Sequence, residues 1–205
     1  MSQYDTIEKQ ASYGIGRRMG DQLARQPFEG LDVTSIQQGL ADALAGLEFA
    51  VDVDSINEAF QEIHQKMEAA SAAKSEAIIA AGEEYLKSNA ARENVVVTDS
   101  GLQYEILNQG DGQPVLKENT VKVHYHGTLI DGTVFDSSVD RNNPATFPVT
   151  GVIPGWVEAL QLMKVGDKYR LTIPYQLAYG ANGAGGAIPP YATLVFDVEV
   201  LDIAS

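Results

Sequence analysis

The chain has 205 residues, of which 44% are hydrophobic and 20% are charged, and its formal net charge is −14. This composition is typical of a globular protein with one or two domains. The negative charge argues against binding to nucleic acid or to an anionic membrane, because both depend on clustered Lys and Arg. Since the chain has no cysteine, disulfides, thiolate nucleophiles and cysteine-ligated metals are excluded.

The first ten residues, MSQYDTIEKQ, show neither the basic segment nor the apolar run of a secretory signal. No segment approaches the ~18 consecutive apolar residues of a membrane-spanning helix. We therefore expect a cytoplasmic protein that has no membrane partner.

Residues 5–25 are predicted to form a helix, with apolar residues near a spacing of 3.6. These residues are Ile7, Ala11, Ile15, Met19 and Leu23. Gly14, Gly16 and Gly20 lie inside this helix, and each costs roughly 1 kcal/mol relative to Ala. Either the helix is weak or kinked, or another backbone packs closely against it. We favour close packing.

A second helix is predicted from Thr34, which forms a capping box with Gln37. One face of this helix is apolar: Ile36, Leu40, Ala43, Leu44 and Leu47. Two short helices have more apolar surface than they can bury alone, and units this small usually need oligomerisation. We therefore expect residues 1–52 to be an all-α dimerisation unit that makes the protein a homodimer.

Ser55 and Glu58 indicate the start of a third helix, rich in strong helix formers, that runs to about Arg92. About 38 residues of helix would span roughly 55 Å. We interpret residues 53–94 as a solvated linking helix. A coiled coil is the alternative, but the apolar seam is too short and irregular for several heptads.

From residue 95 onward the pattern changes to short β-branched and alternating segments. Strands are predicted at residues 95–97, 101–107, 146–149, 168–173 and 192–201, with a hairpin at 121–135. Pro154 suits the first turn of a helix, whose apolar face is Trp156, Ala159, Leu160 and Met163. Many strands with one short helix predict an α+β domain for residues 95–205.

The hairpin gathers several chemically distinct side chains. Apolar and polar residues alternate over residues 121–129, and an Asp-Gly turn follows at once. The return strand ends in Phe135 and Asp136, near Tyr125 on the first strand. Arg141 is close enough in sequence to reach that carboxylate. A phenol, an aromatic ring, an acid and a guanidinium are thus expected to converge.

These motifs, in this order, resemble the FKBP-type peptidyl-prolyl cis-trans isomerases, the macrolide-binding immunophilins. The matching blocks are Val123-His124-Tyr125, Gly127, Asp131-Gly132, Phe135-Asp136-Ser137-Ser138, Arg141, Val152-Ile153, Gly155-Trp156, Ala178-Tyr179-Gly180, Ile188-Pro189-Pro190, Ala192-Thr193-Leu194, Phe196 and Val198-Glu199-Val200. The helices that precede them resemble the Mip-like, dimeric, 22 kDa subgroup of bacterial members. The resemblance implies an antiparallel sheet wrapped over a short helix, and an enzyme that uses no metal and no cofactor.

The resemblance also implies a role for individual residues. Catalysis would rest on Tyr125, Phe135, Asp136, Arg141 and Tyr179. Substrate would be bound by Phe147, Val152, Ile153, Trp156, Ile188 and Phe196. Trp156 would form the floor under the proline ring, while Asp136 would lie near the twisting carbonyl. The Ile153 N–H and the Tyr179 hydroxyl would hold substrate carbonyls. The alternative for the aromatic residues is that they simply form the core.

Rotation about an X-Pro bond crosses a barrier of ~18–20 kcal/mol, because it destroys amide resonance. A dry aromatic pocket would favour the twisted, less polar amide without any proton transfer. The expected partners are unfolded or partly folded polypeptides that contain proline, with macrolides as inhibitors. A second hypothesis is a chaperone that captures unfolded chains, with catalysis incidental; both activities can coexist.

Some features depart from the family or suggest other chemistry. Ala145 stands where the family often has an aromatic residue, and residues 182–187 lack the histidine or proline of some members. Both changes are expected on the rim of the pocket, where they bear on substrate preference and macrolide affinity more than on the reaction itself. His124 and His126 alternate on the strand, on the face opposite Tyr125. Without an evident third ligand, packing or hydrogen bonding is favoured over a metal site.

Overall fold

A computed structural model describes residues 3–25 and 27–204. The chain forms two compact units, residues 1–71 and residues 72–205, and helix α3 (Val53–Ala90) passes from the first into the second. The predicted three-part division, with boundaries after residues 52 and 94, stays a prediction. Within the described ranges, no helix is long and apolar enough to span a bilayer.

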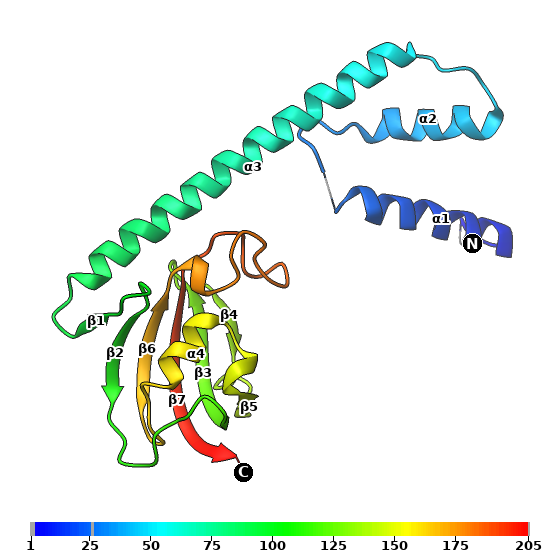
Figure 1. The fold of residues 1–205 in the computed structure, drawn as a ribbon. Coiled ribbons are helices and arrows are strands. Elements are labelled where there is room, and N and C mark those ends of the chain that lie inside the picture. The colour runs from blue at the N-terminus through cyan, green and yellow to red at the C-terminus, as the bar shows by residue number, and fades with distance from the viewer. Residues whose placement is uncertain (1–2, 26, 205) are drawn as a thin grey trace. The chain divides into compact units, whose positions relative to one another are not determined.

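The first unit contains α1 (Ile7–Leu23), α2 (Val33–Ala45) and the start of α3, with α1 and α2 running in opposite directions (Figure 1). The predicted capping box at Thr34 is wrong, because the helix begins one residue before it. The N-cap is Asp32, whose carboxylate accepts a hydrogen bond from the N–H of Ser35 at 2.7 Å. Asp is among the strongest N-cap residues and thus outcompetes the Thr two residues later.

The third helix starts where the predicted range 53–94 starts, but its cap is not the predicted Ser55. Its first residue is Val53, and the carboxylate of Asp52 accepts a hydrogen bond from the N–H of Ser55 at 3.1 Å. Ser55 is therefore an early helical residue and not the cap. In both cases an aspartate ahead of the expected cap satisfies an N–H group that the helix itself leaves unpaired.

The apolar faces of the first unit are largely uncovered within this chain. No residue of α1 or α2, all of which are described, is buried. A Cβ built on Gly14, Gly16 or Gly20 meets no other described atom within 4 Å. Among the described residues of one chain, therefore, no backbone approaches these glycines closely, and their close packing with another backbone stays a prediction.

The second unit is built on a seven-stranded antiparallel sheet. Its strands are β1 (Val95–Val97), β2 (Gln103–Asn108), β3 (Thr120–Leu129), β4 (Val134–Ser137), β5 (Ala145–Pro148), β6 (Lys168–Ile173) and β7 (Leu194–Ala204). The strand order is β1-β2-β6-β7-β3-β4, and β5 also pairs with β3. This arrangement confirms the predicted α+β architecture.

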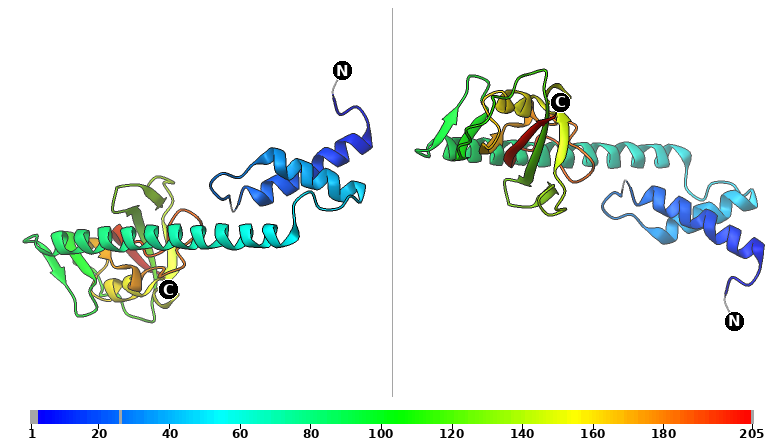
Figure 2. Two further views of the ribbon diagram at one scale, coloured as in Figure 1. Left: turned by 90° about the horizontal axis from the view of Figure 1, so that it is seen from above. Right: turned by 90° about the horizontal axis from the view of Figure 1, so that it is seen from below.

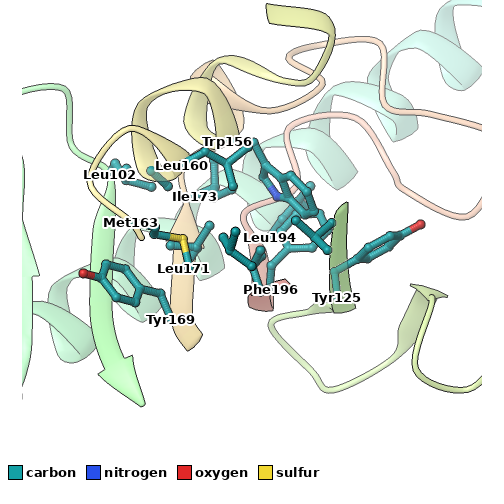
Figure 3. Packing of buried hydrophobic residues seen from close by; sticks show 14 of the residues in the cluster. Leu102, Tyr125, Trp156, Leu160, Met163, Tyr169, Leu171, Ile173, Leu194 and Phe196 are labelled. Atoms are coloured by element: carbon teal, nitrogen blue, oxygen red, sulfur yellow. The ribbon is translucent and has the colours of Figure 1, made fainter. Parts of the chain in front are cut away.

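Helix α4 (Pro154–Leu160) packs on one face of this sheet, and the core lies between them (Figures 1 and 2). Proline occupies the first turn of α4, where its missing N–H costs nothing. Figure 3 shows the packed cluster, which includes Leu102, Leu160, Leu171, Ile173 and Leu194. Each of these side chains is at most 1% exposed. Burying one such side chain contributes about 1.5–3 kcal/mol.

The last part of α3 packs within the second unit. A Cβ on Gly82 would lie 2.6 Å from Oγ1 of Thr193, so a glycine is needed at this contact. Asn89 donates to Oε1 of Gln103 at 2.8 Å and to Oγ1 of Thr172 at 3.2 Å. Because side chains alternate along a strand, Thr172 faces away from the core residues Leu171 and Ile173. Residues 72–90 of α3 thus cover the face of the sheet opposite α4.

Strand β3 changes partner along one of its edges. Residues 126–128 pair with β4, and residues 120–123 pair with β5. Residues 138–144 leave the sheet between these two pairings, opposite His124 and Tyr125. This excursion carries Arg141 and lies beside the candidate site.

Candidate active site

A cavity of about 670 Å³ opens on the α4 side of the sheet. It is lined by Tyr125, Phe135, Asp136, Phe147, Gly151, Val152, Ile153, Trp156, Tyr179, Ala184, Gly185, Ala187, Ile188 and Phe196. All the predicted site residues are in this set except Arg141, which bonds to two of its members. The structure therefore brings the predicted residues together, while their individual roles stay predictions.

Packed aromatic rings, among them that of Phe147, form the floor and walls of the cavity. Trp156 projects from α4 and is 4% exposed. Its ring meets that of Phe196 edge to face, with centroids 5.2 Å apart, and that of Tyr125 at 5.5 Å. Phe135 also meets Phe196 edge to face, at 5.4 Å. Figure 3 shows Trp156 beside Phe196, with the hydroxyl of Tyr125 pointing away from the aliphatic cluster. Such pairs contribute about 0.5–1.5 kcal/mol beyond their burial.

Among the described residues, the indole N–H of Trp156 is the one buried side-chain polar group that makes no hydrogen bond. A buried donor without a partner costs about 1–3 kcal/mol. The ring is thus held by its packing alone, as expected of an apolar floor.

The polar part of the site is a closed triangle of three side chains. The hydroxyl of Tyr125 donates to Oδ2 of Asp136 at 2.5 Å. Arg141 donates from Nη1 to Oδ1 of Asp136 and from Nη2 to the Tyr125 oxygen, the latter at 3.0 Å. The geometry predicted for this trio is present.

The triangle fixes the charge of Asp136. Burial raises the pKa of this carboxyl, but hydrogen bonds from Tyr125 and Arg141 and the positive charge of Arg141 outweigh it and hold the pKa below its ordinary value. Burial, followed by the hydrogen bond to the Asp136 carboxylate, raises the pKa of the Tyr125 phenol. At neutral pH the carboxyl is therefore ionised and the phenol protonated.

A loop that includes Ala184, Gly185, Ala187 and Ile188 forms part of the cavity wall. Ile188 is 7% exposed and exchanges two backbone hydrogen bonds with Ala184, at 2.9 and 3.0 Å. Gly183 directly precedes this turn with a φ of 63°, and a Cβ there would lie 2.2 Å from the Ile188 carbonyl oxygen. Tyr179 stands at the rim with 39% of its surface exposed.

Four lining residues lie outside the predicted catalytic and substrate-binding set: Gly151, Ala184, Gly185 and Ala187. The last three belong to the loop 182–187, which the sequence placed on the rim. Gly151 was not predicted, because it lines the cavity only through the path of its loop. Ala145, also expected on the rim, packs against the core and does not line the cavity.

The two histidines of β3 are engaged in hydrogen bonds. Nδ1 of His124 lies 3.0 Å from Oγ of Ser138, and Nδ1 of His126 lies 2.9 Å from Oγ of Ser137. Across residues 3–25 and 27–204, no group of three or more potential ligands could hold a metal ion. The sequence-based preference for hydrogen bonding at these two positions agrees with this geometry.

Comparisons with known proteins decide what this site belongs to. Residues 112–201 match the family described as "FKBP-type peptidyl-prolyl cis-trans isomerase", and residues 8–106 match the "Domain amino terminal to FKBP-type peptidyl-prolyl isomerase". The FKBP-type 22 kDa peptidyl-prolyl cis-trans isomerase of Escherichia coli (strain K12) is 54% identical over 98% of this chain and 97% of its own length. The chain belongs to the FKBP-type peptidyl-prolyl cis-trans isomerases.

Other relatives extend the match over both units. The outer membrane protein MIP of Legionella longbeachae is 37% identical over 97% of this chain and 86% of its own length. The crystal structure of FkpA from Escherichia coli is 34% identical, with a TM-score of 0.70 over 98% of each chain. The family, the fold and the isomerase activity predicted from the sequence are thus confirmed.

Proposed function

We propose that this isomerase rotates X-Pro bonds by drawing the amide out of water into the aromatic cavity. One observation carries the proposal: among the described residues that line the cavity, Asp136 alone is charged, and its charge is bound by Tyr125 and Arg141. Water stabilises the charge separation of a planar amide. A cavity that offers little such stabilisation favours the twisted amide of the transition state.

The shape of the cavity supports a role for each part of the site. The proline ring would lie on Trp156, between Phe135 and Phe196. Asp136 would face the carbonyl that twists, held in one orientation by its two partners. The Ile153 N–H, at the start of α4, would hold one substrate carbonyl, and the Tyr179 hydroxyl another. No covalent step or proton transfer is required.

The first test measures cis-to-trans conversion of a short X-Pro peptide by wild type and by Asp136→Ala. Removing the carboxylate leaves Arg141 and the Tyr125 hydroxyl without their acceptor, so kcat/KM should fall roughly 10- to 100-fold. Asp99→Ala is the matched control, because Asp99 is an exposed carboxylate outside the cavity. It should leave kcat/KM unchanged.

A further experiment measures the activity of both proteins in the presence of a macrolide. Inhibition of wild type by the macrolide would support the cavity as the catalytic site. An Asp136→Ala variant that folds normally and keeps full activity would overturn the proposed role of the triangle.

We also propose that two copies associate through the first unit. The support is its uncovered apolar surface: Ile7, Leu44 and Phe49 are 81%, 83% and 75% exposed. Hydrophobic side chains gathered on a helical unit this small need another surface to cover them. A second copy offers the same helices and therefore a matching surface.

The oligomeric state of full-length variants tests this association. Leu44→Glu places a charge in the proposed contact, whereas Gln37→Glu adds the same charge at another exposed position of α2. Light scattering should show a monomer for the first variant and a dimer for wild type and the second. A dimer that survives both Leu44→Glu and deletion of residues 1–50 would contradict the proposal.

Two linked sites would also raise the effective concentration for a client chain. On this basis we propose an additional chaperone activity toward unfolded polypeptides. Asp136→Ala should then lose catalysis but still suppress aggregation of an unfolded protein. Loss of both activities in the same proportion would argue that capture occurs in the catalytic cavity.

A further inference from the structure

Ser138 is a buried residue next to the site that does not line the cavity. It is 0% exposed, and its hydroxyl contacts both backbone polar groups of Tyr125. The Tyr125 N–H donates to Oγ of Ser138 at 2.7 Å, and that hydroxyl lies 3.2 Å from the Tyr125 carbonyl oxygen. The backbone N–H of Ser138 donates to the same carbonyl at 3.0 Å.

These bonds fill the gap where β3 changes partner. In an antiparallel strand the N–H and C=O of one residue point to the same neighbouring strand. For Tyr125 that neighbour is missing, because β4 ends at Ser137 and β5 begins at Ala145. The Ser138 hydroxyl accepts the N–H that would otherwise be buried without a partner.

The same residue anchors the excursion that carries Arg141. The carbonyl of Ser138 accepts a hydrogen bond from the N–H of Asn143 at 3.1 Å, which closes the base of the loop. On its other side, Oγ of Ser138 lies 3.0 Å from Nδ1 of His124. Ser138 therefore connects strand β3 to the loop: its hydroxyl contacts β3, and its backbone carbonyl holds the base of the loop.

All three corners of the triangle depend on this anchor. Tyr125 is bonded to it directly, Asp136 precedes it by two residues, and Arg141 follows it by three. A guanidinium that donates to two different side chains, as Arg141 does to Asp136 and Tyr125, requires a narrow range of positions. A small shift of the loop would open the triangle without removing any of its members.

We propose that Ser138 is a positioning residue of the isomerase site, which holds Tyr125 and the Arg141 loop in the geometry that orients Asp136. This inference rests on the proposed role of the triangle. Ser138 itself does not contact substrate. Its effect on catalysis passes through the triangle and disappears when the triangle is already broken.

A double-mutant cycle measures this dependence. Ser138→Ala should lower kcat/KM about tenfold in wild type, since it leaves the Tyr125 N–H unsatisfied and removes the contact of the hydroxyl with His124. In the Asp136→Ala background the same change should lower kcat/KM by less than about twofold, because coupled residues are not additive. Thr172→Ala is the control: it removes a buried hydroxyl from the opposite face of the sheet and should leave kcat/KM unchanged.

The outcomes separate the two proposals. An equal loss in both backgrounds overturns the inference, because Ser138 would then support the fold and not the triangle. Full activity of the single Asp136→Ala variant overturns the role of the triangle instead.

A second variant covers the case in which Ser138→Ala does not fold. His124 is only half-buried, so His124→Ala removes the ring partner of Ser138 with less risk to the core. It should lower kcat/KM about two- to threefold in wild type and have no effect with Asp136→Ala. Equal losses in both backgrounds would again overturn the inference.

Discussion

The two units of this isomerase keep their apolar side chains in different places. In residues 72–205, Leu102, Leu171 and Leu194 are 0% exposed and pack between the sheet and α4. In residues 1–71, Ile7 and Leu44 are more than 80% exposed. The catalytic unit therefore has its own hydrophobic core, whereas the first unit leaves exposed the apolar side chains that a core would bury.

This difference separates the catalytic cavity from the surface proposed for assembly. Every residue that lines the cavity belongs to the second unit, and so do the three members of the triangle. The stability of the site should depend on the packing of the core around Leu171. The stability of the first unit should depend on the surface that covers its helices.

The largest expected effect comes from the core of the second unit. Leu171→Ala should lower the free energy of unfolding of that unit by about 2–5 kcal/mol, because it leaves a cavity in packed surroundings. Trp156 is the single tryptophan of the chain, so its fluorescence reports the unfolding of this unit in urea. Leu44→Ala is the matched control and should change that transition by less than about 0.5 kcal/mol. Equal shifts for both variants would mean that the units unfold together.

Substitutions of one helical glycine in each unit test the same difference between the units, with smaller expected effects. Gly82→Ala should destabilise the second unit by about 1–3 kcal/mol, because the new methyl group meets the buried side chain of Thr193. Gly20 lies in open space within one chain, where Ala would stabilise a helix by about 1 kcal/mol. If a second copy packs against α1, Gly20→Ala should instead weaken the dimer. Dilution followed by light scattering distinguishes these results for Gly20.

Local pattern was enough to predict much of the catalytic unit. Alternation over residues 121–129 identified β3, and an Asp-Gly pair marked its hairpin, because both depend on neighbours in sequence. The cavity residues were placed through the order of whole motifs. Gly151 was missed, since its place in the cavity depends only on where its loop runs.

The anchoring role of Ser138 could not be predicted from the sequence either. It arises because β3 has one pairing partner before Tyr125 and another after it, and such a switch is set by tertiary structure. The predictions of the helix caps were wrong for a more local reason. Two cap residues competed at the start of α2, and the aspartate that came first determined where the helix begins.

That correction gives a smaller prediction for the first unit. Asp32→Ala should lower the stability of α2 by about 1 kcal/mol, because the Ser35 N–H loses its acceptor. Thr34→Ala is the control, since Thr34 lies inside the helix, and it should change stability by less than about 0.5 kcal/mol. Thermal unfolding followed by far-ultraviolet circular dichroism measures both. A larger loss for Thr34→Ala would restore the capping box predicted from the sequence.

The smallest expected effect is the pH dependence contributed by the triangle. The lowered pKa of Asp136 means that its contribution to stability is fully present above the unfolded pKa of about 3.9 and is lost as pH falls through the folded value. Because the Asp136 and Arg141 side chains are 43% and 51% exposed, solvent screens the pair and the loss should be only a few tenths of a kcal/mol.

Carboxyl carbon shifts of Asp136, followed by NMR from about pH 2 to about pH 6, give its pKa directly. Arg141→Gln should raise this pKa, since burial then acts against one fewer hydrogen-bonded cation. Arg92→Gln, which removes an arginine bonded to Glu105 outside the triangle, should leave it unchanged. An unchanged pKa in Arg141→Gln would mean that the guanidinium does not hold the carboxylate in solution. Since Asp136 is ionised at neutral pH with its partners in place, any loss of activity of Arg141→Gln at neutral pH should reflect the orientation of the carboxylate and not its charge.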